Sequence, residues 1–169
     1  MGMKSNFSLE GIQSQHEIIV NNIIAVIEDA LSLAATQLVV YAKNKNGLNV
    51  KDFTDRSNNL RSSIGFVLYK DGQKIGAYFA KSGVGKEGDG EKGTDKGESY
   101  AADVAVKYPE GYVLVLAAGM HYAAYVEAKG YDVLTGASLK MDDEITKYFE
   151  LASSEISEAL NIDLNFVKK

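Results

Sequence analysis

Few residues in this sequence have the types and spacing that catalysis requires. Glu127 with Asp132, or the cluster at residues 142–144, supplies the paired carboxylates that glycoside hydrolysis uses. The cluster is equally explained by the favourable interaction of acidic side chains with the start of a helix. His121 and Glu127 are six residues apart, which does not place them on one helical face for a metal. We therefore expect no catalytic residue, no metal site and no cofactor.

A glycine-rich segment at residues 81–99 contains the pattern Gly83-x-Gly85-x-x-Gly88. This pattern resembles a dinucleotide-binding fingerprint, but such a fingerprint needs an amphipathic helix directly after it, and the residues that follow are charged. The segment also has no Gly-Lys-Ser/Thr sequence to close a phosphate-binding loop. Its composition predicts a mobile loop that becomes ordered against a partner.

Composition excludes several other classes of protein. The 169 residues contain no cysteine, which excludes disulfides and thiolate metal sites. The net charge of −5 argues against a nucleic-acid partner, because phosphate binding needs clustered Lys and Arg. No apolar stretch is expected to approach the roughly 20 residues that span a bilayer, and the N-terminus lacks an apolar signal core. We expect a single cytosolic domain without a membrane partner.

Two long helices are predicted to frame the chain. Apolar residues recur at helical spacing over residues 15–43, after a flexible arm at 1–13, and again over residues 139–162. Ser14 and Glu17 form a capping-box pattern, and Gly47 is a helix stop. The first helix is longer than a compact domain of this size needs. It is either a core helix with one dry face or a helix whose extra length contacts neighbouring subunits.

The middle of the chain predicts a small antiparallel sheet. Two β-rich runs within residues 65–80 flank the turn residues Asp71 and Gly72, which is typical of a hairpin. The apolar run at residues 112–118 is expected to be a third strand paired with this hairpin. A short helical turn that leads into the hairpin is expected at residues 60–64. Residues 100–107 are expected to form a short helix, because they are rich in alanine, or else a strand. The fold class is therefore α+β, with a long N-terminal helix, a small antiparallel sheet built on a β-hairpin and a long C-terminal helix.

The segment at residues 119–131 is interpreted as a structural joint. The strand is expected to end and the chain to turn at Gly119, after which a short amphipathic piece docks Tyr122, Tyr125 and Val126 against another surface. Arg61 is one of only two arginines, and it either braces a carboxylate or a carbonyl cluster or stays a solvated surface charge. Glu127 is the partner that we expect for Arg61.

Two stretches resemble a known family. Residues 55–64, DRSNNLRSSI, resemble the TG-x-LR-x-SI element of the tailed-phage neck and tail-completion proteins, which are head–tail joining morphogenesis proteins. Residues 118–127, AGMHYAAYVE, resemble the second element of that family, YA-x-x-VE-x-G, which here ends at Gly130. Ser57-Asn58 stands where the family has Thr-Gly, and Lys129 where an aromatic residue is more typical. The positions that carry the resemblance are Leu60, Arg61, Ser63, Ile64, Gly119, Tyr122, Tyr125, Val126, Glu127 and Gly130.

The resemblance implies a structural virion protein without enzymatic activity. Such a protein would form a homo-oligomeric ring at the neck, between the portal or its adaptors and the tail. It would be assembled in the cytoplasm of the bacterial host, and DNA would pass through its lumen without specific binding. Other candidates are a tail terminator or another tail protein, a small-molecule binding domain, and a polysaccharide-active enzyme that uses Glu127.

Overall fold

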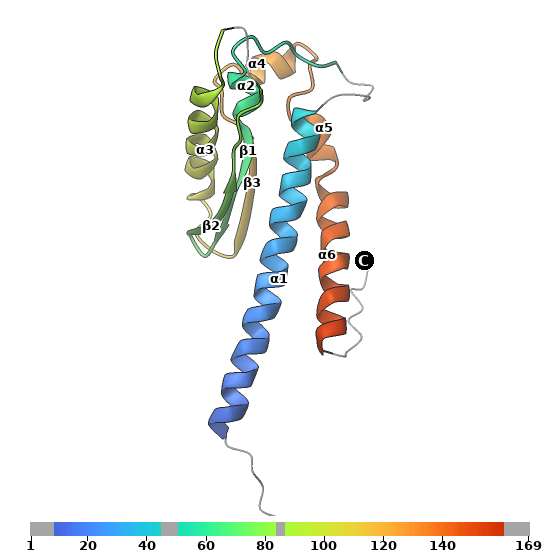
Figure 1. The fold of residues 1–169 in the computed structure, drawn as a ribbon. Coiled ribbons are helices and arrows are strands. Elements are labelled where there is room, and N and C mark those ends of the chain that lie inside the picture. Colours follow the sequence, from blue (N-terminus) through green and yellow to red (C-terminus); the bar gives the residue numbers. More distant parts are fainter. Residues whose placement is uncertain (1–8, 45–50, 84–86, 161–169) are drawn as a thin grey trace, which may run out of the picture.

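The computed structural model describes residues 9–44, 51–83 and 87–160. Within this part of the chain, helices surround one small sheet (Figure 1), which confirms the expected α+β class. The elements, in chain order, are α1 (Leu9–Lys43), α2 (Asn59–Ser62), β1 (Ile64–Lys70), β2 (Gln73–Tyr78), α3 (Glu91–Ala105), β3 (Tyr112–Ala118), α4 (Ala123–Ala128), α5 (Thr135–Leu139) and α6 (Met141–Leu160).

The sheet is antiparallel and has the strand order β2-β1-β3, as the hairpin and the third strand predicted. Asp71 and Gly72 both have positive φ angles, 48° and 76°, which matches the type I′ turn that suits a two-residue hairpin loop. The β1–β3 register is regular over seven pairs, whereas the β1–β2 register shifts between Leu68 and Tyr69. The central strand is therefore β1, and β2 and β3 are the two edges.

The sheet is covered on both faces. In Figure 1, α1 lies against one face and α3 against the other, and α6 lies beside α1 on the side away from the sheet. Because side chains alternate along a strand, Phe66 and Leu68 join the core that includes α1, whereas Val67 and Tyr69 join the core that includes α3. All residues from 64 to 69 are buried, so β1 has no solvent-facing side and its sequence is almost continuously apolar.

The first helix is longer than the sequence predicted. α1 begins at Leu9, so residues 9–13 of the expected flexible arm at 1–13 are helical. Residues 1–8 of that arm and the expected helix stop Gly47 lie outside the described residues. Ser14 donates a hydrogen bond to the carbonyl of Gly11 inside the helix instead of capping its start. At 1.5 Å per residue, the 35 residues span about 52 Å.

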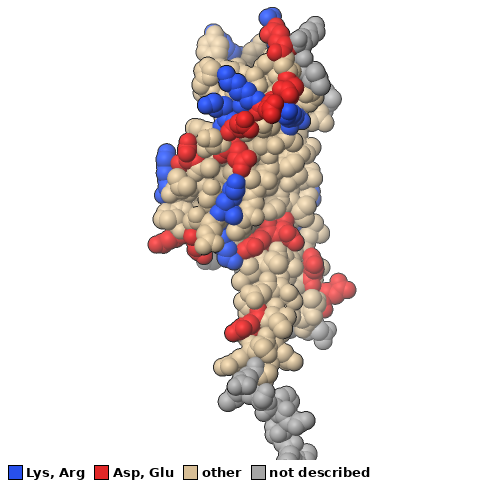
Figure 2. Space-filling view, turned by 60° about the vertical axis from the view of Figure 1, so that its left-hand side comes forward, with Lys and Arg blue, Asp and Glu red and all other residues tan. Residues whose placement is uncertain are grey.

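The two halves of α1 have different surroundings. Its C-terminal half carries the buried side chains Ala34, Leu38 and Ala42, four residues apart, so this face is part of the core. By contrast, every residue from 11 to 22 is exposed, and this end extends beyond the sheet and α6 (Figure 1). Figure 2 shows the extension as almost free of charged side chains on that face.

α1 also has the length and composition of a membrane-crossing helix. Residues Gly11–Lys43 contain an 18-residue window with a mean hydropathy of 1.8, so the expectation that no stretch approaches the required length is wrong. A buried core helix passes the same test, and 28% of this window is buried. Length and composition alone therefore do not separate a core helix from a membrane-spanning one.

The glycine-rich segment is largely helical. The mobile loop expected at residues 81–99 is wrong from Glu91 onward, where α3 begins. The helix includes the first part of the expected segment at 100–107 and ends at Ala105. Residues 84–86 lie outside the described part of the chain. The helix buries a small residue at every fourth position, namely Gly93, Gly97, Ala101 and Ala105. Small residues at this spacing form one flat face, so the backbone of α3 can approach the sheet closely.

Two glycines require this close approach. A Cβ on Gly97 would lie 2.4 Å from the carbonyl oxygen of Ser63, and a Cβ on Gly119 would lie 2.4 Å from the carbonyl oxygen of Lys96. Both distances are far below van der Waals contact with backbone atoms. Gly119 is therefore needed because α3 packs against it, and not for the turn that the sequence suggested.

We expect Gly97→Ala to destabilise the protein, although the same change in an exposed helix interior is stabilising by about 0.5–1 kcal/mol. The new methyl group would force α3 away from β1, which should lower the free energy of unfolding by about 1–3 kcal/mol. Ser99→Ala, at an exposed position of the same helix, is the control and should change it by less than about 0.5 kcal/mol. Urea unfolding measures both, and a Gly97→Ala variant more stable than wild type would contradict the close packing.

Candidate functional site

The two segments that resemble the phage family meet at one end of the domain. The N–H of Gly119 donates to the carbonyl of Ser63 at 3.2 Å, directly beyond the paired residues Ile64 and Ala118. Leu60 and Ile64 from the first segment share the main core with Met120 and Ala123 from the second. Figure 1 accordingly places α2 and α4 at the same end of the sheet. The structure therefore brings together residues that are some 60 positions apart in the chain.

Arg61 joins three segments through its guanidinium group. Nη2 donates to both carboxylate oxygens of Asp52 at 3.0 Å and to the carbonyl of Phe53 at 3.1 Å, while Nη1 donates to the carbonyl of Lys43. The guanidinium also lies over the Phe53 ring, 4.7 Å from its centroid. This geometry confirms that Arg61 braces a carboxylate and a group of carbonyls. It ties the end of α1 to residues 52–53 and to α2.

Glu127 is not the partner of Arg61, so that expectation is wrong. Its carboxylate accepts hydrogen bonds from the backbone N–H groups of Val133, Leu134 and Thr135 at 3.0, 2.9 and 3.2 Å. These donors lie at the start of α5, where N–H groups have no partner within the helix and favour a negative charge. Glu127 therefore stabilises the turn between α4 and α5, and Gly130 supports that turn with a φ of 80°.

Only part of the expected aromatic packing is present around α4. Tyr122 and Val126 pack against the main core, whereas Tyr125 is 64% exposed and does not pack against it. His121 lies edge-on to Tyr122, with 5.1 Å between the ring centroids. Burial raises the pKa of the Tyr122 hydroxyl, and the nearby carboxylate of Asp55 raises it further, although a hydrogen bond with Ser57 opposes both.

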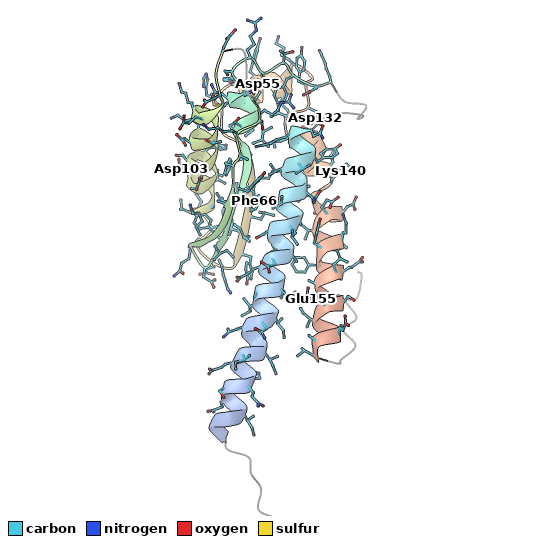
Figure 3. All side chains as sticks on the ribbon, viewed as in Figure 1. Asp55, Phe66, Asp103, Asp132, Lys140 and Glu155 are labelled. Carbon is cyan, nitrogen blue, oxygen red and sulfur yellow. The ribbon has the colours of Figure 1, made fainter. Side chains whose placement is uncertain are left out.

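The carboxylates that suggested catalysis have structural roles. Asp132, which Figure 3 labels near the end of α1, accepts a hydrogen bond from the N–H of Gly136 at 2.9 Å. Glu127 accepts the hydrogen bonds from the backbone at the start of α5 that are described above. Both therefore position α5. Within residues 9–44, 51–83 and 87–160, no group of three or more His, Cys, Asp or Glu side chains could hold a metal ion.

A groove that sequence reasoning missed runs between α1 and α6. It is open to solvent and has a volume of about 470 Å³. Its apolar side chains are Ile19, Ile23 and Val26 on one helix and Ile156 and Leu160 on the other. Glu155, labelled in Figure 3 on α6, stands at its border. The helical spacing of these residues was visible in the sequence, but their pairing across two distant helices was not.

Comparisons with models of protein families, with curated proteins and with solved structures find no match to this chain. The likeness to neck and tail-completion proteins rests on the two short elements alone and stays a prediction.

Lys43 is a partly buried cation at the end of α1. Its ammonium group donates to the carbonyl of Ala80 at 2.7 Å, and burial lowers its pKa from 10.5 to about 8. Because the unfolded chain holds this proton more tightly, stability should rise with pH above the folded-state pKa.

We expect the free energy of unfolding to increase by about 1–2 kcal/mol between pH 8 and 9.5 through Lys43. The Lys43→Met variant should lose this increase, since it has no proton to release. Subtracting the unfolding curves of the two proteins at each pH removes the contribution of the remaining lysines and tyrosines. Parallel pH profiles for the two proteins would contradict the lowered pKa.

We expect Arg61→Lys to lower the free energy of unfolding by about 1–3 kcal/mol, because the donors of a single ammonium nitrogen cannot reproduce the planar spread with which the guanidinium reaches Asp52 and both carbonyls. The matched control is Arg56→Lys. The Arg56 side chain is 77% exposed and lies 3.9 Å from Glu87, so its replacement should cost less than about 0.5 kcal/mol. Equal losses in chemical denaturation would show that the fork geometry of Arg61 does not matter.

Proposed function

We propose that this chain is a structural subunit that assembles with copies of itself into a ring, as a neck protein that joins the head of a tailed phage to its tail. The observation that carries the proposal is the exposed apolar end of α1. The close packing of the two family-like segments is consistent with the resemblance, and it supports the choice of the neck over other assemblies.

The apolar end of α1 is a surface that needs a partner. Ile12 and Ile19 are 50% and 40% exposed, and with Ile23 and Val26 they follow spacings of seven, four and three residues, which places them on one face. This stripe runs directly into the α1–α6 groove. Monomeric soluble proteins rarely expose continuous apolar surface of this kind, so the stripe favours association.

The charge distribution suits a conduit for DNA better than a protein that binds it. The net charge is −5, and on the face in Figure 2 the basic side chains are interspersed with acidic ones. A strongly basic lumen would hold the phosphate backbone, whereas a neutral or acidic one lets it slide. The partners in this proposal are further copies, the portal or its adaptors, and tail proteins in the virion.

Two other functions remain candidates. A tail terminator or tube protein would use the same self-association and differ only in its neighbours. A small-molecule binding domain would use the α1–α6 groove, whose volume lies within the usual range for ligand sites. We propose no enzymatic activity, since Glu127 and Asp132 are engaged with the backbone around α5.

We expect light scattering of the purified chain to give the mass of a discrete oligomer, with closed rings in negative stain. Ile12→Gln combined with Ile19→Gln should shift the mass toward the monomer, because it removes apolar area without touching the core. Gln13→Ala combined with Gln15→Ala alters the same exposed turns and should leave the oligomer intact. A wild-type chain that stays monomeric and instead sediments with lipid vesicles would replace this proposal with membrane binding by α1.

A further inference from the structure

Within the described part of the chain, the backbone groups on the outer edge of β3 have no partner. At the two ends of the β1–β3 ladder, Gly119 donates to Ser63 and Asp71 donates to the carbonyl of Gly111. Hydrogen-bonded pairs alternate along an antiparallel ladder, so the odd-numbered residues of β3 bond to β1. The N–H and C=O groups of Tyr112, Leu114, Leu116 and Ala118 therefore point away from the sheet.

The two edges of the sheet are protected to different degrees. β2 has a register shift and carries Lys74, which pairs with Glu98 at 2.8 Å; both features discourage the addition of another strand. β3, with the sequence YVLVLAA, has no charge, no proline and no register shift over its seven pairs. An apolar edge without such protection is suited to pairing with a further strand.

A trough of about 590 Å³ follows this edge. Val104 and Tyr108 at the end of α3 form one wall, Met141 at the start of α6 contributes to the other, and residues 112–116 form the floor. Glu110 lies at the end where β3 begins. The trough is thus a shallow, mostly apolar surface beside an open strand edge, with a carboxylate at one end, and it can receive an extended peptide.

We propose that this trough receives residues 161–169 of a neighbouring copy as an additional antiparallel strand. These residues read NIDLNFVKK, in which Ile162, Leu164 and Phe166 alternate with polar residues, as in a strand with one buried face. An antiparallel orientation places Lys168 and Lys169 beside Glu110. Main-chain hydrogen bonds supply affinity in this mode, and alternate side chains supply specificity.

The length of the chain after Leu160 limits how far it can reach into the chain's own trough. Leu160 ends α6, about 28 Å along the helix axis from Met141 in the trough wall. Nine extended residues reach about 30 Å, so returning to Met141 would use almost the whole segment and leave little to pair with β3. A neighbouring copy has no such restriction. This inference rests on the proposed self-assembly and names the contact that would repeat around the ring.

The test compares two full-length variants. Leu164→Asp combined with Phe166→Asp disrupts the apolar positions, whereas Asp163→Asn combined with Asn165→Asp exchanges the polar ones and leaves the composition unchanged. We expect the first variant to lose the oligomer in light scattering and the second to keep it. In the first variant, amide hydrogen exchange at Leu114 and Leu116 should accelerate by at least about tenfold, while Val115, bonded to β1, stays protected.

A synthetic peptide with the sequence of residues 161–169, added to the disrupted variant, should restore protection at Leu114 and Leu116. If the disrupted variant keeps the wild-type oligomer, or if the peptide leaves these amides unprotected, the strand inference is wrong while the ring proposal stands. If the wild-type chain is monomeric with slow exchange at both amides, its own residues fill the trough. That result overturns the neighbouring-copy assignment and the self-assembly together.

Discussion

The burial of β1 on both faces is the constraint on which the rest of the structure depends. No side chain from Ile64 to Tyr69 can face water, so the strand needs one cover for Phe66 and Leu68 and another for Val67 and Tyr69. α1 supplies the first cover and α3 the second. The backbone of α3 approaches the backbone of the sheet at Gly97, which lies in α3, and at Gly119, which follows β3. Direct contact between backbones fixes the distance between the helix and the sheet.

Arg61 and Glu127 fix the end of the domain at which these layers are joined. Arg61 holds the carbonyl of Lys43 together with Asp52 and Phe53, and thus positions the chain between α1 and α2. Glu127 holds the backbone from Val133 to Thr135 and thus positions the chain between α4 and α6. A charged side chain bonded to backbone groups fixes irregular segments that have no ladder of their own. The family-like residues therefore act as supports within the fold.

Local periodicity explains which features the sequence could predict. The two long helices and the Asp71-Gly72 hairpin depend on residues close in the chain, and both are present. α3 was missed because its glycines and charges outweigh its apolar residues, although the four-residue spacing of Gly93 and Gly97 was visible. The partner of Arg61 was missed for a different reason. Asp52 and Glu127 are both carboxylates, and only the three-dimensional path of the chain decides between them.

The two exposed apolar surfaces of this fold, the stripe on α1 and the trough along β3, differ in structure. This difference affects which kind of assembly they can form. The apolar stripe of α1 is helical and lies beyond the sheet, whereas the β3 trough presents backbone groups beside α3. Either surface paired with its own copy about a two-fold axis, as apolar helices and antiparallel strand edges can be, would give a dimer. Contacts between unlike surfaces repeat from copy to copy and end only when the rotation closes. A ring is the closed form of such a contact, and a filament is its open form.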